Sequence, residues 1–438
     1  MIDLNAEPIK AVIIHPVTGG GSAIFSDYDL EEAVRLAEAL DAHVVEAHVV
    51  PVREIRAGEY FGKGKAAEIG DMVSAHEAKL VIINTSLAPI QQRNLEELWN
   101  AKVIDRTGMI LEIFALRAAT KEGRLQVELA RQSYERSRLV RTWTHLERQR
   151  GGQGFLAGPG ETQIESDRRM LDQKIGKIRK AIDQVRRTRE LQRTKRQRAP
   201  ERVVALVGYT NTGKSTLFNR LTEGGVLEKD MLFATLDTTH RILPLPSGRS
   251  AVMSDTVGFI SDLPTHLVTA FRATLEEVKE ADIILHIRDV SDPMSERRKK
   301  DVLDILDSLD AGPNHHQPIL EVMNKADLLS PEDFIVAQER AAASRENENA
   351  TSSFLISSIK RQGLTELMEG LEAELGADDE VVDMLIPPSE YAVRAWLHEH
   401  GDVISEETTD KGEAKMSVRL PAIEAGIVRS RHWNLLAH

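Results

Sequence analysis

Apolar runs alternate with amphipathic segments over the first 120 residues, and this pattern predicts a small α/β domain. The runs are almost uniformly apolar, which is typical of parallel strands that are buried on both faces of a sheet. In the segments between them, apolar residues recur every three or four positions, as in helices that cover a sheet. The predicted strands are 11–17, 43–52, 79–87 and 101–106. The predicted helices are 29–40, 66–78, 94–100 and 109–119.

The pattern changes between residues 121 and 198, where apolar positions form a heptad seam. The seam has spacings of 4, 3, 4 and 3 and consists of Leu171, Ile175, Ile178, Ile182 and Val185. A similar but interrupted stripe precedes it at Leu125, Leu129, Leu139, Trp143 and Leu146. Two long helices that bury these stripes against each other predict an antiparallel hairpin. The glycine-rich segment 148–165 is its predicted tip loop.

Residues 199–377 return to apolar runs followed by helix-like segments, which predicts a second α/β domain with a mostly parallel sheet. The tail, residues 378–438, reads as short strands around one helix-like segment and predicts a small α+β appendage. We therefore expect four units along the chain. They are an α/β domain at 1–120, a helical hairpin at 121–198, a second α/β domain at 199–377 and the appendage at 378–438.

The second α/β domain opens with a phosphate-loop (P-loop) motif. Gly208 and the pair Lys214-Ser215 complete the spacing G-x-x-x-x-G-K-S after a strand-like run and before a helix-like segment. Glycines allow backbone N–H groups to surround a β-phosphate, while the lysine reaches the β- and γ-phosphates and the serine ligates Mg²⁺. The predicted nucleotide-binding residues here are Gly208, Tyr209, Thr210, Asn211, Thr212, Gly213, Lys214 and Ser215.

The sequence NKAD at 324–327 follows another strand-like run and predicts the base. The carboxylate of Asp327 can accept from both N1–H and the 2-amino group of guanine, whereas adenine has no donor at either position. GTP and GDP are therefore the expected ligands. The predicted base-binding residues are Asn324, Lys325, Ala326 and Asp327, with backbone support from Ser357 and Ser358.

A DTVG sequence between these motifs is predicted to bind the metal and the γ-phosphate. Its residues are Asp255, Thr256, Val257 and Gly258. Asp255 would hold Mg²⁺ through water, and the N–H of Gly258 would contact the γ-phosphate. The next residue is Phe259, where Ras-type GTPases carry the glutamine that orients the attacking water. We expect slow hydrolysis without a partner; the alternative is that Phe259 packs and another side chain orients the water.

A threonine ahead of DTVG is expected to complete the metal shell when the γ-phosphate is present. The segment that supplies it consists of Phe233, Ala234, Thr235, Leu236 and Asp237. Thr238 and Thr239 follow directly, and spacing does not choose among the three threonines.

Composition places the chain among soluble globular proteins. Its 438 residues are 41% hydrophobic and 29% charged, with no cysteine, so disulfides and thiolate metal sites are excluded. We find neither a basic-apolar leader nor an apolar stretch long enough to span a bilayer. A cytoplasmic protein is expected, with or without a membrane-associated fraction. We also expect a monomer.

Charge is distributed very unevenly, and the hairpin is the basic part. Residues 131–200 contain 19 Lys and Arg against 8 Asp and Glu, although the whole chain has a net charge of −13. A solvated helical surface usually mixes both signs, so this excess favours contact with phosphates. Aromatic residues are scarce in the segment, which favours recognition of structured RNA by shape and backbone. We expect no DNA partner.

Two further glycine clusters raise the alternative of a second phosphate site in the N-terminal domain. They are Gly19-Gly20-Gly21 and Gly62-Lys63-Gly64-Lys65. Neither completes a known motif, so we interpret both as solvated turns.

The chain resembles the HflX family of translational GTPases over roughly residues 10–375. The matching segments are GPGETQIESDRR at 158–169, GYTNTGKSTLFN at 208–219, FATLD at 233–237, DTVGFI at 255–260 and NKAD at 324–327. The first of these, directly ahead of the P-loop domain, is specific to that family. The resemblance favours Thr235 as the switch threonine. It implies Ser215 and Thr235 as metal ligands and Lys214, Thr235 and Gly258 as catalytic residues.

The resemblance also implies a fold and a function. The fold is a P-loop GTPase domain preceded by a small α/β domain and a long helical hairpin, and followed by an appendage. The function is GTP hydrolysis, stimulated by the ribosome, in a factor that binds the large ribosomal subunit and its rRNA. Such a factor splits stalled or idle ribosomes, notably under stress. Two alternatives stay open: a GTPase of ribosome assembly or RNA modification, and an RNA remodeller with a second nucleotide site in its N-terminal domain.

Overall fold

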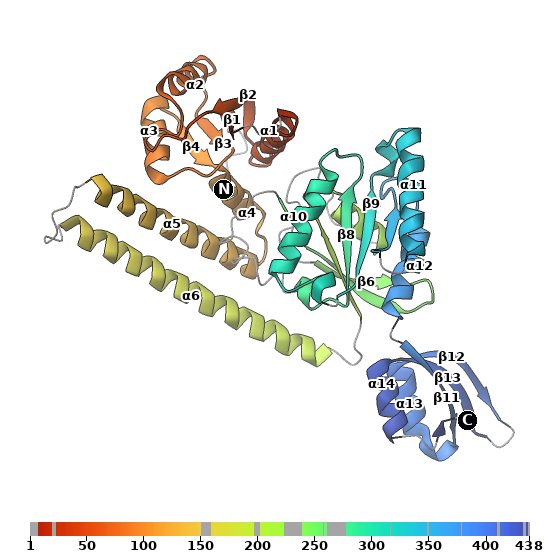
Figure 1. The fold of residues 1–438 in the computed structure, drawn as a ribbon. Helices are drawn as coiled ribbons and strands as arrows, with labels where there is room; N and C mark the ends of the chain where they lie inside the picture. The colour runs from red at the N-terminus through yellow and green to blue at the C-terminus, as the bar shows by residue number, and fades with distance from the viewer. Residues whose placement is uncertain are drawn as a thin grey trace.

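The computed structural model describes residues 8–19, 23–149, 159–196, 202–222, 239–256, 258–260, 277–315, 317–347, 350–377, 379–409, 412–431 and 435–436. Figure 1 shows two α/β units with a long helical hairpin beside them and a smaller unit at the far end of the chain. The predicted α/β fold class, with a mostly parallel sheet in the P-loop domain, is confirmed.

The N-terminal unit is a parallel sheet of order β2-β1-β3-β4 with helices on both faces. Its elements are β1 (Lys10–Thr18), α1 (Ala23–Glu38), β2 (His43–Val52), α2 (Lys63–Ala75), β3 (Leu80–Ile83), α3 (Pro89–Trp99), β4 (Lys102–Asp105) and α4 (Arg106–Arg117). Separate apolar clusters cover the two faces, as uniformly apolar strands predict. One expectation was wrong: Lys63 to Lys65 are not a turn, because Gly62 is extended as an N-cap and α2 begins at Lys63.

The helices α5 (Lys121–Gln149) and α6 (Pro159–Arg196) run side by side and form what we call the arm (Figure 1). Ile175 and Ile182 of the predicted seam are buried, and they join the same apolar cluster as α4. Helix α6 begins at Pro159, so Gly160 to Glu165 are helical rather than part of the tip loop. Proline suits the first helical turn, where its missing N–H costs no hydrogen bond.

The base of the arm is docked on the N-terminal unit through a polar cluster. The hydroxyl of Tyr134 donates to Asp105 Oδ1 at 2.7 Å, and Arg138 donates to Gln92 Oε1 at 2.6 Å. Burial and the adjacent Asp105 carboxylate raise the pKa of Tyr134 well above its ordinary value, so it remains a donor. The arm and the N-terminal unit are therefore joined by both apolar and polar contacts.

The P-loop domain, here the G unit (202–377), contains a six-stranded sheet of order β10-β9-β8-β5-β7-β6 in which only β6 is antiparallel to its neighbour. Its strands are β5 (Val203–Gly208), β6 (Thr239–Pro244), β7 (Ser250–Asp255), β8 (Ile283–Asp289), β9 (Ile319–Asn324) and β10 (Ser353–Leu355). Its helices are α7 (Lys214–Leu221), α10 (Ser295–Ser308), α11 (Pro331–Glu346) and α12 (Leu364–Leu375), with short turns at Pro313–His315 and Ala326–Leu328.

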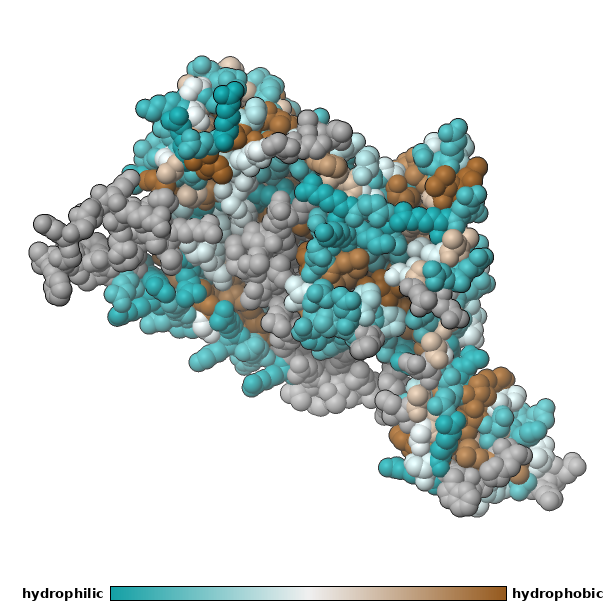
Figure 2. All heavy atoms as spheres, viewed as in Figure 1, coloured by the Kyte–Doolittle hydropathy of each residue, from teal (hydrophilic) through white to brown (hydrophobic). Residues whose placement is uncertain are grey.

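Helices cover both faces of this sheet. Apolar residues of α7 and α12 pack on one face, and Val302 and Leu306 of α10 pack on the other. The outward side of α10 is hydrophilic in Figure 2. Because β5, β7, β8 and β9 are parallel, their carboxyl ends meet at one edge, which is where ligands bind in open α/β sheets.

The C-terminal unit (379–436) has its own antiparallel sheet, of order β11-β13-β12. Its elements are β11 (Asp379–Ile386), a short turn at Pro388–Glu390, α13 (Tyr391–His400), β12 (Asp402–Thr408), β13 (Ala414–Pro421) and α14 (Ala422–Arg431). The pattern of the tail predicted the three strands and α13 but not α14, whose Ala425 and Val428 are buried in the core of the unit. Within the described residues, no helix has the length and apolarity needed to cross a membrane.

Candidate functional site

Two glycines shape the loop between β5 and α7. Gly208 has a φ of 153°, and a Cβ there would lie 2.2 Å from the carbonyl oxygen of Ile287. Gly213 has a φ of 91°, and a Cβ there would lie 2.3 Å from Asn324 Nδ2. Both positions therefore exclude any side chain by conformation and by space. The loop ends at the N-terminus of α7, whose free N–H groups favour an anion.

Lys214, the first residue of α7, is buried beneath the loop. Its Nζ donates to the carbonyl oxygens of Tyr209 at 2.6 Å and Gly208 at 3.0 Å. Burial lowers the pKa of Lys214 to about 8, against the opposing effect of the Asp255 carboxylate. The side chain is thus held inside the loop in its charged form at neutral pH. Its contact with phosphates stays a prediction.

Ser215 and Asp255 meet where α7 begins and β7 ends. Ser215 Oγ donates to Asp255 Oδ2 at 2.8 Å. Beside them, Thr256 Oγ1 donates to the carbonyl oxygen of Leu206 at 2.6 Å and holds the end of β7 against β5. Serine and aspartate oxygens are hard donors of the kind that Mg²⁺ prefers, so this pair fits a magnesium site. The third candidate, Thr235, lies outside the described residues, as do the rest of 233–237 and Val257.

Gly258 and Phe259 lie against the phosphate loop. Phe259 N–H donates to the carbonyl oxygen of Gly208 at 3.0 Å, and Thr210 N–H donates to that of Phe259 at 2.8 Å. A Cβ at Gly258 would lie 2.9 Å from Thr210 Cγ2 and 3.1 Å from Lys214 Nζ, so a larger residue would require the phosphate loop to shift. The side chain of Phe259 is buried in the apolar cluster under α10. Of the two interpretations that the sequence left open, this geometry favours packing.

Asn324 connects the candidate base loops to the phosphate loop. Its Nδ2 donates to the carbonyl oxygen of Thr212 at 2.8 Å, and its Oδ1 accepts from the N–H and Oγ of Ser358 at 3.0 and 2.9 Å. The hydroxyl of Ser357 donates to Asp327 Oδ1 at 2.5 Å. The two serines therefore contact the NKAD turn through their side chains as well as through backbone, although sequence alone led us to expect only a backbone contribution.

Lys325 is oriented by a separate ion pair. It has a φ of 66°, and its Nζ lies 2.7 Å from Asp289 Oδ2 at the end of β8. The N–H of Ala326 donates to the carbonyl oxygen of Ile356 at 3.1 Å. The NKAD turn is thus tied to β8 and to the end of β10, which brings all four of its residues to the same edge of the sheet as the phosphate loop.

Helix α1 of the N-terminal unit faces the phosphate loop and Lys325 across a cavity. A cavity of about 570 Å³ lies between α1, the phosphate loop and Lys325. Tyr209 donates its hydroxyl hydrogen to Glu32 Oε2 at 2.5 Å, and the guanidinium of Arg298 lies 4.5 Å from the centre of the Tyr209 ring. Sequence reasoning did not identify Glu32 or Arg298, because contacts between separate domains leave no periodic pattern.

Three family models match successive parts of the chain: the N-terminal region of GTP-binding GTPases at 27–115, their middle region at 117–196, and a 50S ribosome-binding GTPase at 203–325. The GTPase HflX of Magnetococcus marinus is 43% identical over 405 residues, which cover 92% of this chain and 91% of that protein. The chain belongs to the HflX family of GTPases. The HflX protein of Escherichia coli is 41% identical over 401 residues, covering 91% of this chain and 92% of that protein.

A crystal structure of a GTP-binding protein from the archaeon Sulfolobus solfataricus, in complex with GDP, is 23% identical with a TM-score of 0.44, and covers 84% of this chain and 98% of that one. Membership of the HflX family includes the N-terminal unit and the arm as well as the G unit. Glu32 lies in the range matched by the first family model and Tyr209 in the range matched by the third.

Proposed function

We propose that this HflX-family chain binds GTP with Mg²⁺ between its phosphate loop and its NKAD turn, and hydrolyses it as a translation factor on the large ribosomal subunit. The observation that carries the proposal is the bonding of Asn324, which joins Thr212 of the phosphate loop to Ser358 beside the base loop. These contacts support one composite site for the phosphates and the base. The action on ribosomes is dissociation of stalled or idle particles.

Each residue of the proposed site has its own role in hydrolysis. Lys214 neutralises charge on the β- and γ-phosphates, and the N–H of Gly258 contacts the γ-phosphate. Asp327 accepts from guanine, and Ser357 holds that carboxylate by its hydrogen bond. Water attacks the γ-phosphorus as the bond to the β–γ bridging oxygen breaks, which gives GDP and inorganic phosphate. Ser215 would hold Mg²⁺ together with Thr235, and Asp255 would bind it through water; the ion supplies charge stabilisation to the phosphates.

The positive charge of the arm and the matching family model both support the ribosome as the partner. The arm carries the excess of positive charge that the sequence concentrates in residues 131–200. The family model that matches 203–325 describes a 50S ribosome-binding GTPase. Phosphate contacts along the arm would position the chain on rRNA, and the glycine-rich tip would enter the subunit. Phe259 is buried and so cannot orient the attacking water itself; in the proposed mechanism the ribosome supplies or orders the group that does.

The proposal is tested by sedimenting ribosomes through sucrose gradients with the full-length protein. With GTP or a non-hydrolysable analogue, the particles should separate into subunits and the protein should travel with the large subunit; with GDP they should stay intact. The Lys214→Ala variant is the matched control and should leave ribosomes whole. Ribosomes that remain intact with wild-type protein and GTP would count against the splitting role.

The alternatives give different outcomes in the same gradients. A GTPase of ribosome assembly or RNA modification would bind precursor particles and leave mature ribosomes whole. A remodeller with a second nucleotide site would retain ATPase activity in the Lys214→Ala variant. The basic arm, which is docked on the N-terminal unit, favours the splitting factor over both.

A further inference from the structure

The C-terminal unit is attached to the edge of the G unit that lies opposite the nucleotide site. Arg202 precedes β5 and Arg249 precedes β7, whereas the phosphate loop follows β5 and Asp255 ends β7. The two strands are parallel, so both arginines lie at their amino ends. Figure 1 shows the C-terminal unit beyond this edge. It is therefore placed, among the described residues, to act on the site through the strands rather than by direct contact.

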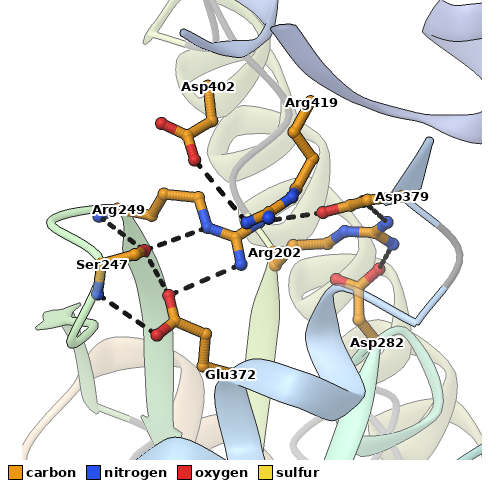
Figure 3. Close-up of polar contacts among 8 residues, drawn as sticks. All are labelled: Arg202, Ser247, Arg249, Asp282, Glu372, Asp379, Asp402 and Arg419. Atoms are coloured by element: carbon orange, nitrogen blue, oxygen red, sulfur yellow. Dashed lines mark hydrogen bonds and ion pairs between the residues drawn. The ribbon is translucent and has the colours of Figure 1, made fainter. Parts of the chain in front are cut away.

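Asp379, the first residue of β11, binds both arginines. Its Oδ2 lies 2.8 Å from Arg249 and its Oδ1 lies 3.4 Å from Arg202, so that each carboxylate oxygen takes one cation (Figure 3). The side chain of Asp379 is only 5% exposed, whereas those of Arg249 and Arg202 are 22% and 34% exposed. We call these three residues the latch. Ion pairs that are shielded to this degree are screened less by solvent than surface pairs.

Each arginine of the latch is also held by the G unit. Arg202 lies 3.0 Å from Asp282 Oδ1, ahead of β8. Arg249 lies 3.5 Å from Glu372 of α12, and Glu372 also accepts from the N–H of Ser247 in the turn between β6 and β7 at 3.2 Å (Figure 3). The latch therefore joins the first residue of the C-terminal unit to the tip of the β6–β7 hairpin and to the start of β5.

Among the described residues, no apolar core joins the C-terminal unit to the G unit. The core of the C-terminal unit is made of residues from 382 onward, and the cores of the G unit contain none of them. Two units without a common core move relative to each other unless polar contacts hold them. The polar contacts that hold them here converge on Asp379.

The β6–β7 hairpin, which the latch holds, is connected along the chain to residues of the candidate metal site. Residues 233–237, which carry the candidate switch threonine, lie just ahead of β6, and β7 ends in Asp255. A shift of the hairpin tip along the strand direction would move Asp255 relative to Ser215, because the tip and Asp255 lie at the two ends of the short strand β7. The tip that the latch holds is thus mechanically connected, through β7, to Asp255 of the candidate metal site.

We propose that Asp379 is a positioning residue and that the latch couples the C-terminal unit to nucleotide exchange in the G unit. With the latch closed, the hairpin is held and bound GDP is released slowly. A partner that displaces the C-terminal unit opens the latch, loosens the β6–β7 hairpin and speeds exchange. The regulation rests on the GTP site proposed above, whereas the mechanical link between the units does not.

The test uses full-length protein carrying Asp379→Asn, Arg249→Gln, or both. Asp383→Asn is the matched control, because Asp383 is an exposed residue of the same strand. Hydrogen exchange in 243–250 is measured without nucleotide, and release of a fluorescent GDP is followed by stopped flow. We expect each single variant to speed both the hydrogen exchange of 243–250 and the release of GDP by on the order of fivefold, which is typical of a modest coupling energy. The double variant should speed both by less than the product of the two single effects, because the Arg249–Asp379 pair is already broken in Asp379→Asn and only the contact of Arg249 with Glu372 remains to be lost.

Arg249→Gln leaves the pair of Arg202 with Asp379 intact, so it tests the coupling with least risk to folding. Unchanged hydrogen exchange in both single variants overturns the mechanical link. Faster exchange of the hairpin with unchanged GDP release overturns the coupling to the site. Effects equal to those of Asp383→Asn also overturn it. Failure of the wild type to bind fluorescent GDP would instead count against the proposed GTP site, and the hydrogen-exchange arm would still decide the link.

Discussion

The hydroxyl of Tyr209 donates to Glu32 at 2.5 Å, so a residue of the phosphate loop is bonded directly to helix α1 of the N-terminal unit. The same carboxylate is paired with Arg106 and lies 3.6 Å from Arg298. Glu32 is buried, and two cations and one hydroxyl compensate for its charge. The shape of the phosphate loop therefore depends on a domain that contains none of the predicted nucleotide ligands.

Removal of the Tyr209 hydroxyl should weaken the junction between the two units. Tyr209→Phe keeps the ring under Arg298 but takes one donor from a buried carboxylate, which costs about 1–3 kcal/mol. We expect a lower free energy of unfolding in urea and a weaker affinity for GDP. Tyr391→Phe is the control, since Tyr391 is 71% exposed. Equal stability of the two variants would show that the hydrogen bond contributes nothing.

Base preference should follow the carboxylate of Asp327. In Asp327→Asn the new amide donates where the carboxylate accepted, so GTP should bind more weakly and xanthosine triphosphate, with its 2-carbonyl, more tightly. A site that hydrogen-bonds its ligand discriminates by up to about 10⁴. Competition against fluorescent GDP measures both affinities. Glu332→Gln, an exposed change nearby, should leave them as they are. Equal binding of ATP and GTP by the wild type would refute the assignment.

The affinity for GTP should fall as pH rises through about 8, the value to which burial lowers the pKa of Lys214. Phosphates favour the charged lysine, so binding above this pH requires uptake of a proton, and the affinity changes by at most about tenfold per pH unit. Titrations of GDP and GTP from about pH 7 to about pH 9.5 test this. A flat profile would mean that Lys214 keeps its proton throughout.

The stability of the nucleotide-free protein should change in the opposite direction. The ordinary pKa of lysine is 10.5 and that of folded Lys214 is about 8, so the unfolded chain binds more protons between these values. Burial of the charged lysine costs folding free energy. This cost is fully present below about pH 8 and decreases as the pH rises toward 10.5. Lys214→Met should therefore raise the free energy of unfolding most at neutral pH, and the gain should shrink in alkali. Urea denaturation at several pH values measures it.

The chain alone predicted the elements that local pattern determines. Uniformly apolar strands, the seam through Ile175 and Ile182, and the glycines of the phosphate loop each follow from steric or solvation rules that act within a few residues. The pairing of Tyr209 with Glu32 and the latch at Asp379 were not predictable, because they depend on how separately folded units dock. Helix α14 was missed for a related reason: its short apolar stripe has meaning only against the sheet of its own unit.

Phe259→Gln, which restores the residue of Ras-type GTPases, should not speed hydrolysis by the free protein. The side chain at this position is 3% exposed and packs in a cluster with Ala205, Val207 and Val278. A buried amide there should cost about 3 kcal/mol or more of stability, through lost packing and unpaired polar atoms. Phe259→Leu should cost less than about 1.5 kcal/mol and leave turnover unchanged. Single-turnover hydrolysis and thermal unfolding are measured for both variants. Ras-like acceleration by glutamine would show that this segment leaves the core during catalysis.

The arm should have two separable roles, positioning on rRNA and splitting of subunits. Six cations at the end of α6 are replaced by glutamine: Arg186, Arg187, Arg189, Arg193, Lys195 and Arg196. If all contact phosphates, affinity for the large subunit should fall, and the slope of log K against log salt should shrink by up to about 4 to 5, near 0.7 to 0.9 per contact. Changing the five arginines to lysine keeps the charge and should preserve most of the slope.

Shortening the tip between Gly151 and Gly160 should have the complementary effect. The deletion removes no basic residue of the arm, so salt-dependent binding to the large subunit and GTP affinity should persist. Splitting should be lost, because the remaining helices cannot carry a side-chain-poor segment into a narrow crevice. Titrations at several salt concentrations, with subunit separation followed by light scattering, test both variants together. Splitting at the wild-type rate after deletion of the tip would mean that the loop only connects the helices and that another surface separates the subunits.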